Sequence, residues 1–233
     1  MKRLYLIPVR EICNASCSFC YMKEKEINTA IPQFIDISNL EEIVDEIRSE
    51  IKEVEITGGG EPLLHKEIGK IIELFKSRKI YTKMYTNGFL LKEIPKVDEI
   101  NISRVHWNSE INNKFYQSSQ QNDLDDVLTH YQKFSNKIRM QTILLKDAID
   151  SKEKALQFIR KYEDKVDVFM FRTLFNSCSL DKENFIPYFD LNHPKVKIDK
   201  TLDNYSQNLY FLNTSGRLQE KFDYGKKKLK IIE

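Results

Sequence analysis

The 233-residue sequence has little net charge, no long apolar run and only four cysteines. Because no run approaches the roughly 18 residues of a membrane-spanning helix, no membrane partner is expected. The formal net charge is +2 with both signs interspersed, so composition does not favour a nucleic-acid partner. Proline and glycine are scarce, repeats and long linkers are absent, and the length fits one large domain or a domain with a small appendage.

The first residues, MKRLYLIPVREIC, lack the small-residue cleavage site of a signal peptide, and an arginine follows their short apolar run. We interpret them as a first strand and predict a cytoplasmic protein. Cys13, Cys17 and Cys20 fall within eight residues, whereas Cys178 stands alone. That crowding does not suit the disulfide framework of a secreted protein. It indicates metal-ligating thiols in a reducing compartment.

Strand-like and helix-like patterns alternate along the first 175 residues. Runs rich in β-branched and aromatic residues predict strands at 3–9, 53–57, 80–86, 98–107, 137–145 and 165–175. Periodic apolar residues predict helices at 36–51, 65–79, 120–135 and 151–164. Ser38 and Ser151 suit the N-caps of the first and last of these helices. The alternation predicts parallel β-α-β crossovers and an α/β fold, either an open or closed barrel or a doubly wound layer.

The C-terminal part of the sequence has a different pattern. Residues 195–199 and 208–222 look like strands, and Asn213–Gly216 suits a hairpin turn. We therefore expect residues 1–178 to form the core, with the cysteine loop at 10–24. Residues 179–233 are expected to form a short C-terminal β extension that packs on the core and closes the mouth of the barrel.

Polar and glycine-rich stretches follow most of the predicted strands. They are the cysteine loop, Gly58–Glu61, Thr86–Gly88, Arg104–Asn108 and Arg172. In α/β sheets and barrels, ligands bind at the carboxyl ends of the strands. This repeated placement predicts an active site at that edge without depending on any single motif.

The C-x3-C-x2-C spacing favours an iron–sulfur cluster over zinc. Three thiolates hold three corners of a [4Fe–4S] cube and leave the fourth iron open to a small molecule. Structural zinc takes four ligands, often from two C-x2-C pairs. A fourth ligand here would be Cys178 or one of four histidines, none of which lies in a recognisable zinc-ligand pair. A non-catalytic zinc-binding structural protein is the distant alternative.

The cysteine motif, with Phe19 before its third cysteine, is followed by GGGEP (58–62) after the second strand. This combination resembles the radical S-adenosylmethionine (radical SAM) superfamily over about residues 3–175. The branch with the molybdenum-cofactor cyclase and peptide-modifying enzymes, where GGEPLLH and a TNG are familiar, is the most similar. The resemblance implies a partial (β/α)6 TIM-like barrel, a [4Fe–4S] cluster and S-adenosylmethionine (SAM). The tail has no cysteines, which departs from members with an auxiliary cluster.

The resemblance also implies the roles of the two main motifs. The cluster ligands would be Cys13, Cys17 and Cys20. The residues that contact the methionine amino group of SAM would be Gly59, Gly60 and Glu61. Glycines allow a close backbone approach, and a strand-end carbonyl or a carboxylate suits an ammonium donor. Taken without the cysteines, the glycine run is equally typical of a plain turn before a helix.

Other residues are candidates for binding SAM by the same resemblance. Phe19 would lie along the adenine, and Tyr21 is a second aromatic candidate, although core packing explains either ring. The polar candidates at strand ends are Asn87, Ser103, Arg104, Asn108, Gln141 and Arg172. Gln141 and Arg172 are equally explained as buried polar residues with satisfied partners.

Several further residues have two interpretations. Cys178 could donate a hydrogen atom to a product radical or be a half-buried free cysteine. His106 and Trp107 could face the substrate or have structural roles. The tail residues that could contact substrate are Tyr205, Tyr210, Phe211 and Arg217. Hairpin packing explains the aromatic members of that set as well.

The family's chemistry implies a one-electron reduction of SAM, which yields methionine and a 5′-deoxyadenosyl radical that removes a hydrogen atom from a substrate. A low-potential donor such as a flavodoxin or ferredoxin is the expected partner. The first hypothesis for the substrate is a small molecule, or one that resembles a nucleotide. The alternative is a peptide or protein, as for a glycyl-radical activase or a peptide modifier.

Overall fold

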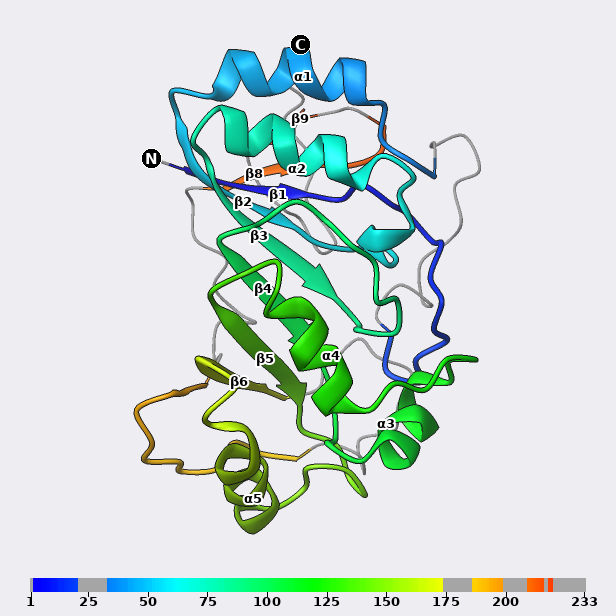
Figure 1. Cartoon of the computed structure of the whole chain (residues 1–233), viewed down its shortest axis with the longest axis vertical. Coiled ribbons are helices and arrows are strands. Elements are labelled where there is room, and N and C mark those ends of the chain that lie inside the picture. The colour runs from blue at the N-terminus through cyan, green and yellow to red at the C-terminus, as the bar shows by residue number, and fades with distance from the viewer. Residues whose placement is uncertain (1, 21–32, 174–185, 199–208, 216–217, 220–233) are drawn as a thin grey trace.

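Parallel strands separated by helices make up the core (Figure 1). The structure, a computed structural model, describes residues 2–20, 33–173, 186–198, 209–215 and 218–219. The core strands are β1 (Lys2–Leu6), β2 (Ile51–Ile56), β3 (Tyr81–Thr86), β4 (Glu99–Ser103), β5 (Ile138–Ile143) and β6 (Val168–Arg172). The six predicted strands are confirmed, with ends that differ by a few residues.

The helices between the strands largely follow the sequence prediction. The described helices are α1 (Ile37–Ile47), the 3-10 helix η2 (Pro62–Leu64), α2 (Ile68–Ser77), α3 (Ser109–Tyr116), α4 (Leu124–Tyr131) and α5 (Lys152–Tyr162). Ser151 caps α5 as predicted, because its side chain accepts a hydrogen bond from the Lys154 amide. The predicted cap of α1 is wrong. Asp36 is the N-cap, and its carboxylate accepts a hydrogen bond from the Ser38 amide at 2.8 Å.

Helix α3 is absent from the sequence prediction. The Asn108 side chain caps it by accepting a hydrogen bond from the Ile111 amide at 3.0 Å. It ends at Gln117, whose φ of 49° lies in the left-handed region. Only Asn112 and Tyr116 are buried along this helix, so its apolar periodicity is too weak to show in the sequence.

The tail adds strands to both edges of the core sheet. Its strands are β7 (Val196–Ile198), β8 (Leu209–Leu212) and β9 (Leu218–Gln219), close to the predicted positions. The strand order is β7-β6-β5-β4-β3-β2-β1-β8-β9, and among these described strands only the β8–β9 pair is antiparallel. The described strands β7 and β9 end the sheet at opposite sides, so hydrogen bonds do not close it into a full barrel.

The helices cover one face of the sheet, and charged side chains occupy the other. Strand residues such as Leu4, Met84 and Ile102 are fully buried with the helices in one continuous apolar cluster. On the opposite face, which we call the inner face, burial raises the pKa of Tyr85 on β3, and Arg172 on β6 is close enough to oppose that rise. Three strand spacings of about 4.8 Å separate β3 from β6 in a flat sheet. The proximity of these side chains therefore indicates a sheet that curls like a partial barrel.

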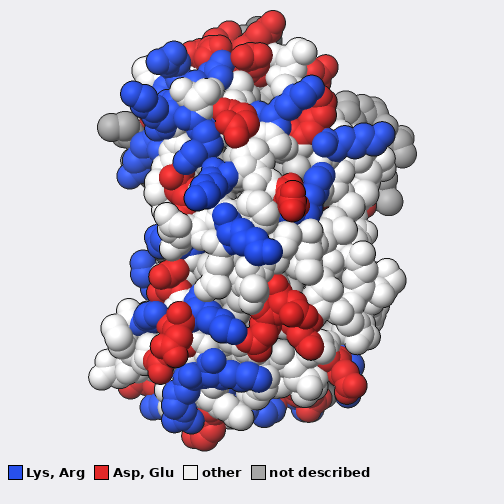
Figure 2. Space-filling view, viewed as in Figure 1, with Lys and Arg blue, Asp and Glu red and all other residues white. Residues whose placement is uncertain are grey.

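The outer surface carries both signs of charge. Figure 2 shows lysine and arginine interspersed with aspartate and glutamate over α1, α2 and α5. A largely uncharged area lies at the right of this view, where Figure 1 has the segment that follows β1. Within the described part of the chain, no helix combines the length and apolar character that crossing a membrane requires.

Candidate active site

The cysteine loop and the glycine run lie side by side at the carboxyl ends of β1 and β2. The Glu11 amide donates to the Gly59 carbonyl at 2.8 Å, and Arg10 and Gly59 form an isolated parallel bridge. Two residues after Gly59, the Glu61 amide donates to the Ile12 carbonyl at 3.0 Å. Two motifs separated by about forty residues in sequence therefore form one backbone-paired unit at the expected edge of the sheet.

Glycine is required where these two segments meet. A Cβ atom added to Gly60 would lie 2.1 Å from the Ile12 carbonyl oxygen, and one added to Gly58 would lie 2.0 Å from the Gly60 oxygen. Neither position has a positive φ, so the requirement comes from the close approach of backbone to backbone. The glycine run is thus more than a flexible turn, because it lets the segment before Cys13 pack against it.

Helix α3 holds the cysteine loop from its other side. The Ser16 amide donates to the Tyr116 carbonyl at 2.8 Å, and the Ser18 amide donates to the Phe115 carbonyl at 2.9 Å. Just beyond the helix, the Ser118 hydroxyl donates to the backbone carbonyl of Asn14 at 2.9 Å. The sequence prediction missed these contacts, and the weak signal that could have found them is the N-cap pattern that begins at Asn108.

Glu61 and Asn87 connect the motifs to the end of β3. The Glu61 carboxylate is 2% exposed and accepts hydrogen bonds from the Leu63 amide at 3.2 Å and the Asn87 amide at 2.8 Å. The Asn87 side-chain nitrogen lies 2.7 Å from Asn14 Oδ1 and 3.7 Å from Cys13 Sγ. Both oxygens of Glu61 are therefore engaged by the protein backbone, and the carboxylate holds the site together.

Glu61→Gln is expected to flatten the pH dependence of stability between pH 4.5 and 7. Burial raises the pKa of Glu61 from 4.5 to about 7, so the folded state binds this proton more tightly than the unfolded state. The free energy of unfolding of the wild type then falls as pH rises through this range, by on the order of 3 kcal/mol. Urea denaturation at several pH values measures the slope. Parallel slopes in wild type and variant would contradict this assignment.

The three cysteines lie beside this network and form no disulfide among the described residues. Cys13 is exposed, and Cys17 and Cys20 are partly buried. Although Cys13 as a whole residue is exposed, desolvation of its thiol and the neighbouring Glu61 and Cys20 raise the pKa of that thiol, whereas hydrogen bonds to it oppose the rise. Among the described residues, no three His, Cys, Asp or Glu side chains are grouped to hold a single metal ion. In a [4Fe–4S] cube each thiolate binds a different iron, so a cube does not require the three sulfurs to meet at one ion.

Phe19 lies in a small apolar cluster beneath the cysteine loop. It packs with Phe89 and Tyr116, and its ring meets the Tyr116 ring edge to face at a centroid distance of 5.2 Å. Cys17 also contacts this cluster. Phe19 is 9% exposed, so packing accounts for most of its surface.

Arg104 lies on the helix side of the sheet. It is 1% exposed, its Nη2 donates to the Asn122 carbonyl at 3.2 Å, and its guanidinium lies over the Phe89 ring. Asn108 is an exposed helix cap, as described above. These two candidates are therefore occupied by structural contacts.

His106 and Trp107 pack outward, toward α5. Their rings stack at 4.0 Å, and Trp107 also contacts Phe158. The Asn108 amide donates to His106 Nδ1, and burial lowers the pKa of His106 to about 4. These contacts favour the structural interpretation of both residues.

The remaining candidates fall into two groups. Ser103, Gln141 and Arg172 lie at or near the carboxyl ends of β4, β5 and β6, on the alternation that faces inward, and all three are partly buried. The candidates that lie outside the described residues are Tyr21, Cys178, Tyr205 and Arg217.

Two of the tail residues named as substrate candidates are described, and both are buried, Tyr210 at 3% exposure and Phe211 at 8%. Phe211 pairs with Tyr5 of β1 in the sheet register. The Tyr210 hydroxyl donates to Glu50 at 2.7 Å and accepts from Lys2 at 2.8 Å. These partners lie at the starts of β1 and β2, which favours packing over substrate contact for Tyr210.

The inner face carries two groups of ion pairs, one across β1 to β3 and one at β4 and β5. Their members are Arg3, Glu53, Glu55, Lys83, Glu99, Lys137 and Arg139. Lys83 bridges two carboxylates, at 2.9 Å from Glu53 and 3.5 Å from Glu55. The Tyr85 hydroxyl donates to Glu55 at 2.8 Å. Asn101 Oδ1 is buried without a hydrogen-bond partner among the described residues. The interior of the curled sheet is therefore polar, and at Asn101 it retains an unused acceptor.

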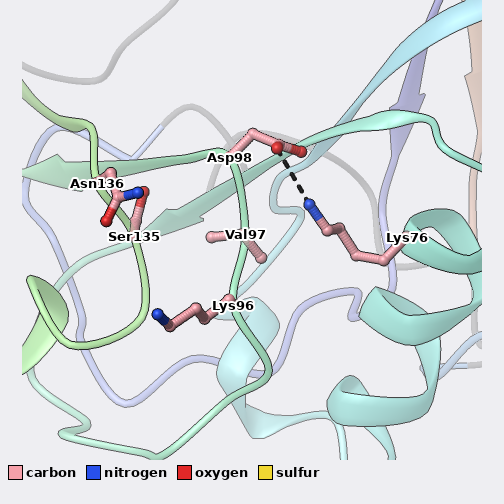
Figure 3. Close-up of a pocket in the computed structure, with 6 residues that line it drawn as sticks. All are labelled: Lys76, Lys96, Val97, Asp98, Ser135 and Asn136. Carbon is pink, nitrogen blue, oxygen red and sulfur yellow. Dashed lines mark hydrogen bonds and ion pairs between the residues drawn. The ribbon is translucent and has the colours of Figure 1, made fainter.

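A separate pocket of about 230 Å³ lies at the opposite end of the strands (Figure 3). Its lining residues are Lys76, Lys96, Val97, Asp98, Ser135 and Asn136. Lys76 points to Asp98 across it and pairs with that carboxylate at 3.0 Å. Because Asp98 and Asn136 precede β4 and β5, this pocket is far along the sheet from the cysteine loop. It does not belong to the candidate site.

Comparisons with known proteins agree with this geometry. Residues 7–159 match the family model described as "Radical SAM superfamily". A protein of Methanocaldococcus jannaschii, named as a glycyl-radical enzyme activating enzyme, is 27% identical over 169 residues, or 65% of this chain and 61% of that protein. A protein of Sulfolobus acidocaldarius, named as a GTP 3′,8-cyclase, is 33% identical over 102 residues, or 43% of this chain and 32% of that protein. The matches thus span less than two thirds of either relative.

Solved structures share the fold. SuiB of Streptococcus suis, bound to its precursor peptide SuiA, superposes with a TM-score of 0.71 at 14% sequence identity. That match covers 94% of this chain and 59% of SuiB. SuiB bound to S-adenosylmethionine gives a TM-score of 0.69 at 17% identity, covering 98% of this chain and 62% of that one. The predicted partial barrel is confirmed by these likenesses.

Proposed function

The chain belongs to the radical SAM superfamily, whose enzymes use a [4Fe–4S] cluster and SAM, and on that premise we propose a specific activity for it. The protein cleaves SAM reductively and abstracts a hydrogen atom from a small polar or nucleotide-like substrate. One observation carries the proposal: the cysteine loop, the glycine run and Asn87 form one hydrogen-bonded unit at the carboxyl ends of the strands.

Each part of this unit has a proposed task. Cys13, Cys17 and Cys20 hold the cluster, which when bound supplies a low-potential electron for the cleavage of SAM to a 5′-deoxyadenosyl radical. The backbone of Gly59 and Gly60 lets the methionine end of SAM approach closely, because no side chain stands in the way. We further propose that the protein is cytoplasmic and that a flavodoxin or ferredoxin delivers the electron.

The polar inner face supports a polar substrate. Two of its carboxylates are buried, since the side chains of Glu55 and Glu99 are only 4% and 0% exposed. Gln141 and Arg172 lie nearer the carboxyl ends of the strands on the same face, where they suit contacts to SAM or substrate.

A peptide or protein substrate is the second candidate. It is favoured by the relative with the longer alignment, which is named for activating a glycyl-radical enzyme. An activase of that kind would form a complex with a large partner enzyme, whereas an enzyme for small molecules would turn over alone. Analytical ultracentrifugation with a purified glycyl-radical enzyme separates the two candidates.

Anaerobic reconstitution tests the proposed activity directly. We expect protein purified without oxygen and loaded with iron and sulfide to bind about four irons per chain, as one cube requires. With dithionite and SAM, it should release 5′-deoxyadenosine, which chromatography quantifies. A panel of nucleotides and small metabolites should contain a compound that accelerates that release. Uptake of zinc in place of iron, or no deoxyadenosine from an iron-loaded protein, would contradict the proposal.

A further inference from the structure

We propose that Asn87 is a positioning residue that donates a hydrogen bond to the sulfur of Cys13 and thereby raises the reduction potential of the bound cluster. The inference rests on the proposed function only in requiring that Cys13 is a cluster ligand. It concerns a side chain that lies 74 residues from that cysteine in sequence and approaches it from the end of β3.

The orientation of the Asn87 carboxamide is fixed by its neighbours. Its Oδ1 accepts a hydrogen bond from the Phe89 amide at 3.0 Å, and a backbone N–H group can only donate. The nitrogen must therefore point the other way, toward Cys13 and Asn14. Asn14 Oδ1 receives one of its two hydrogens at 2.7 Å, and Cys13 Sγ lies at 3.7 Å, within hydrogen-bond distance for sulfur. A flipped amide would lose all of these contacts.

The turn that carries Asn87 is firmly held. The Asn87 amide is bound by the buried Glu61 carboxylate at 2.8 Å. The next residue, Gly88, has a φ of +74°, a conformation that favours glycine, and its amide donates to the Thr86 hydroxyl. The Asn122 side chain closes the turn by donating to the Gly88 and Phe89 carbonyls. Asn87 is 8% exposed, so little water competes for its donor.

A donor at a cluster thiolate has a defined electronic effect. Reduction adds negative charge to the cluster and its sulfurs, and a hydrogen bond stabilises the more electron-rich state. The Asn87 amide therefore makes the cluster easier to reduce. The nearby Glu61 carboxylate acts in the opposite direction when it is charged, because it adds negative charge near Cys13. Asn87 is the described side-chain donor that offsets it at this sulfur.

Asn87→Asp and Asn87→Ala test this inference in the reconstituted protein. Aspartate keeps the shape and the acceptor for Phe89 but replaces the donor with an oxygen, and alanine removes both. We expect each midpoint potential, followed by electron paramagnetic resonance without SAM, to become more negative, with the larger shift for aspartate. A tenfold change in the reduction equilibrium corresponds to about 59 mV for one electron. Iron content confirms that the compared samples are equally loaded.

Asn122→Ala is the matched control. It removes a carboxamide that supports the same turn without reaching the sulfur, so the potential should remain that of the wild type. An unchanged potential in iron-loaded Asn87→Asp, or an equal shift in Asn122→Ala, overturns the inference while leaving the proposed function intact. A wild type that assembles no cluster overturns both.

If a variant fails to hold iron, a measurement on the wild type tests the hydrogen bond instead. Protein labelled with ¹⁵N-asparagine should show a weak nitrogen coupling to the reduced cluster in pulsed electron paramagnetic resonance, because the Asn87 nitrogen lies beside Cys13 Sγ. Absence of any asparagine nitrogen coupling overturns the hydrogen bond. The two readouts together separate an electronic role of Asn87 from a purely structural one.

Discussion

Cys17→Ala is expected to abolish iron uptake and SAM cleavage together. With two thiolates left, the cube loses one of its three protein ligands, and no other Cys, His, Asp or Glu in the described residues is grouped to replace it. Cys17 is partly buried against the small cluster around Phe19, where alanine preserves most of the packing. We expect iron per chain to fall close to background in colorimetric assays and deoxyadenosine to fall with it.

Cys178→Ala separates an open cluster from a closed four-thiolate site. It removes the remaining thiol of the chain, and iron content should stay at the wild-type level because three ligands suffice. Loss of metal in this variant, or full iron retention in Cys17→Ala, would contradict the assignment of the three clustered cysteines. Loss of metal from Cys178→Ala would instead favour zinc, because structural zinc takes four ligands.

Gly60→Ala is expected to cause a large loss of stability. The new Cβ would lie 2.1 Å from the Ile12 carbonyl oxygen, so the two backbones must separate. Separation breaks the hydrogen bond from the Glu61 amide to Ile12 and displaces the loop that precedes Cys13. We expect a loss of about 3 kcal/mol, which for a chain of this size lowers the melting temperature by about 6–12 °C. Iron retention should fall as well.

Gly69→Ala is the control for that substitution. Gly69 lies within α2, and an added Cβ would meet only Pro95 side-chain atoms at 3.7 Å or more, an ordinary contact distance. Alanine in a helix is favoured over glycine by about 0.5–1 kcal/mol, so this variant should be as stable as the wild type or slightly more so. If Gly60→Ala had the same melting temperature as the Gly69→Ala control and kept its iron, the close-approach argument would be refuted.

The strands could be predicted from the sequence because buried and less buried residues alternate along them. Residues such as Leu4 and Leu6 face the helices, and the intervening positions face the polar interior. The same rule locates Arg104, which continues the alternation of Ile100 and Ile102 onto the helix side. Its position at the end of a strand suggests a ligand group, whereas the alternation along β4 places it on the helix side.

The contacts that assemble the site were not readable from sequence. Asn14 and Ser118 meet through a backbone carbonyl, and Ser16 is held by a carbonyl of α3, so no side-chain pattern records either contact. Helix α3 itself buries few residues and gives little periodic signal. The motifs showed which residue types carry the chemistry. Their arrangement depends on tertiary pairing between segments that are distant in the chain.

The placement of β8 has a consequence for the synthesis of the molecule. β8 pairs with β1 between Arg3 and Leu209, a separation of 206 residues. At about 5–20 residues per second, the ribosome takes roughly 10 to 40 s to make the partner for one edge of its first strand. During that time the hydrogen-bonding groups on this edge of β1 are open to pairing with other chains. A segment synthesised after the whole core thus covers this edge of β1, and a chaperone that shields nascent β1 would serve this fold.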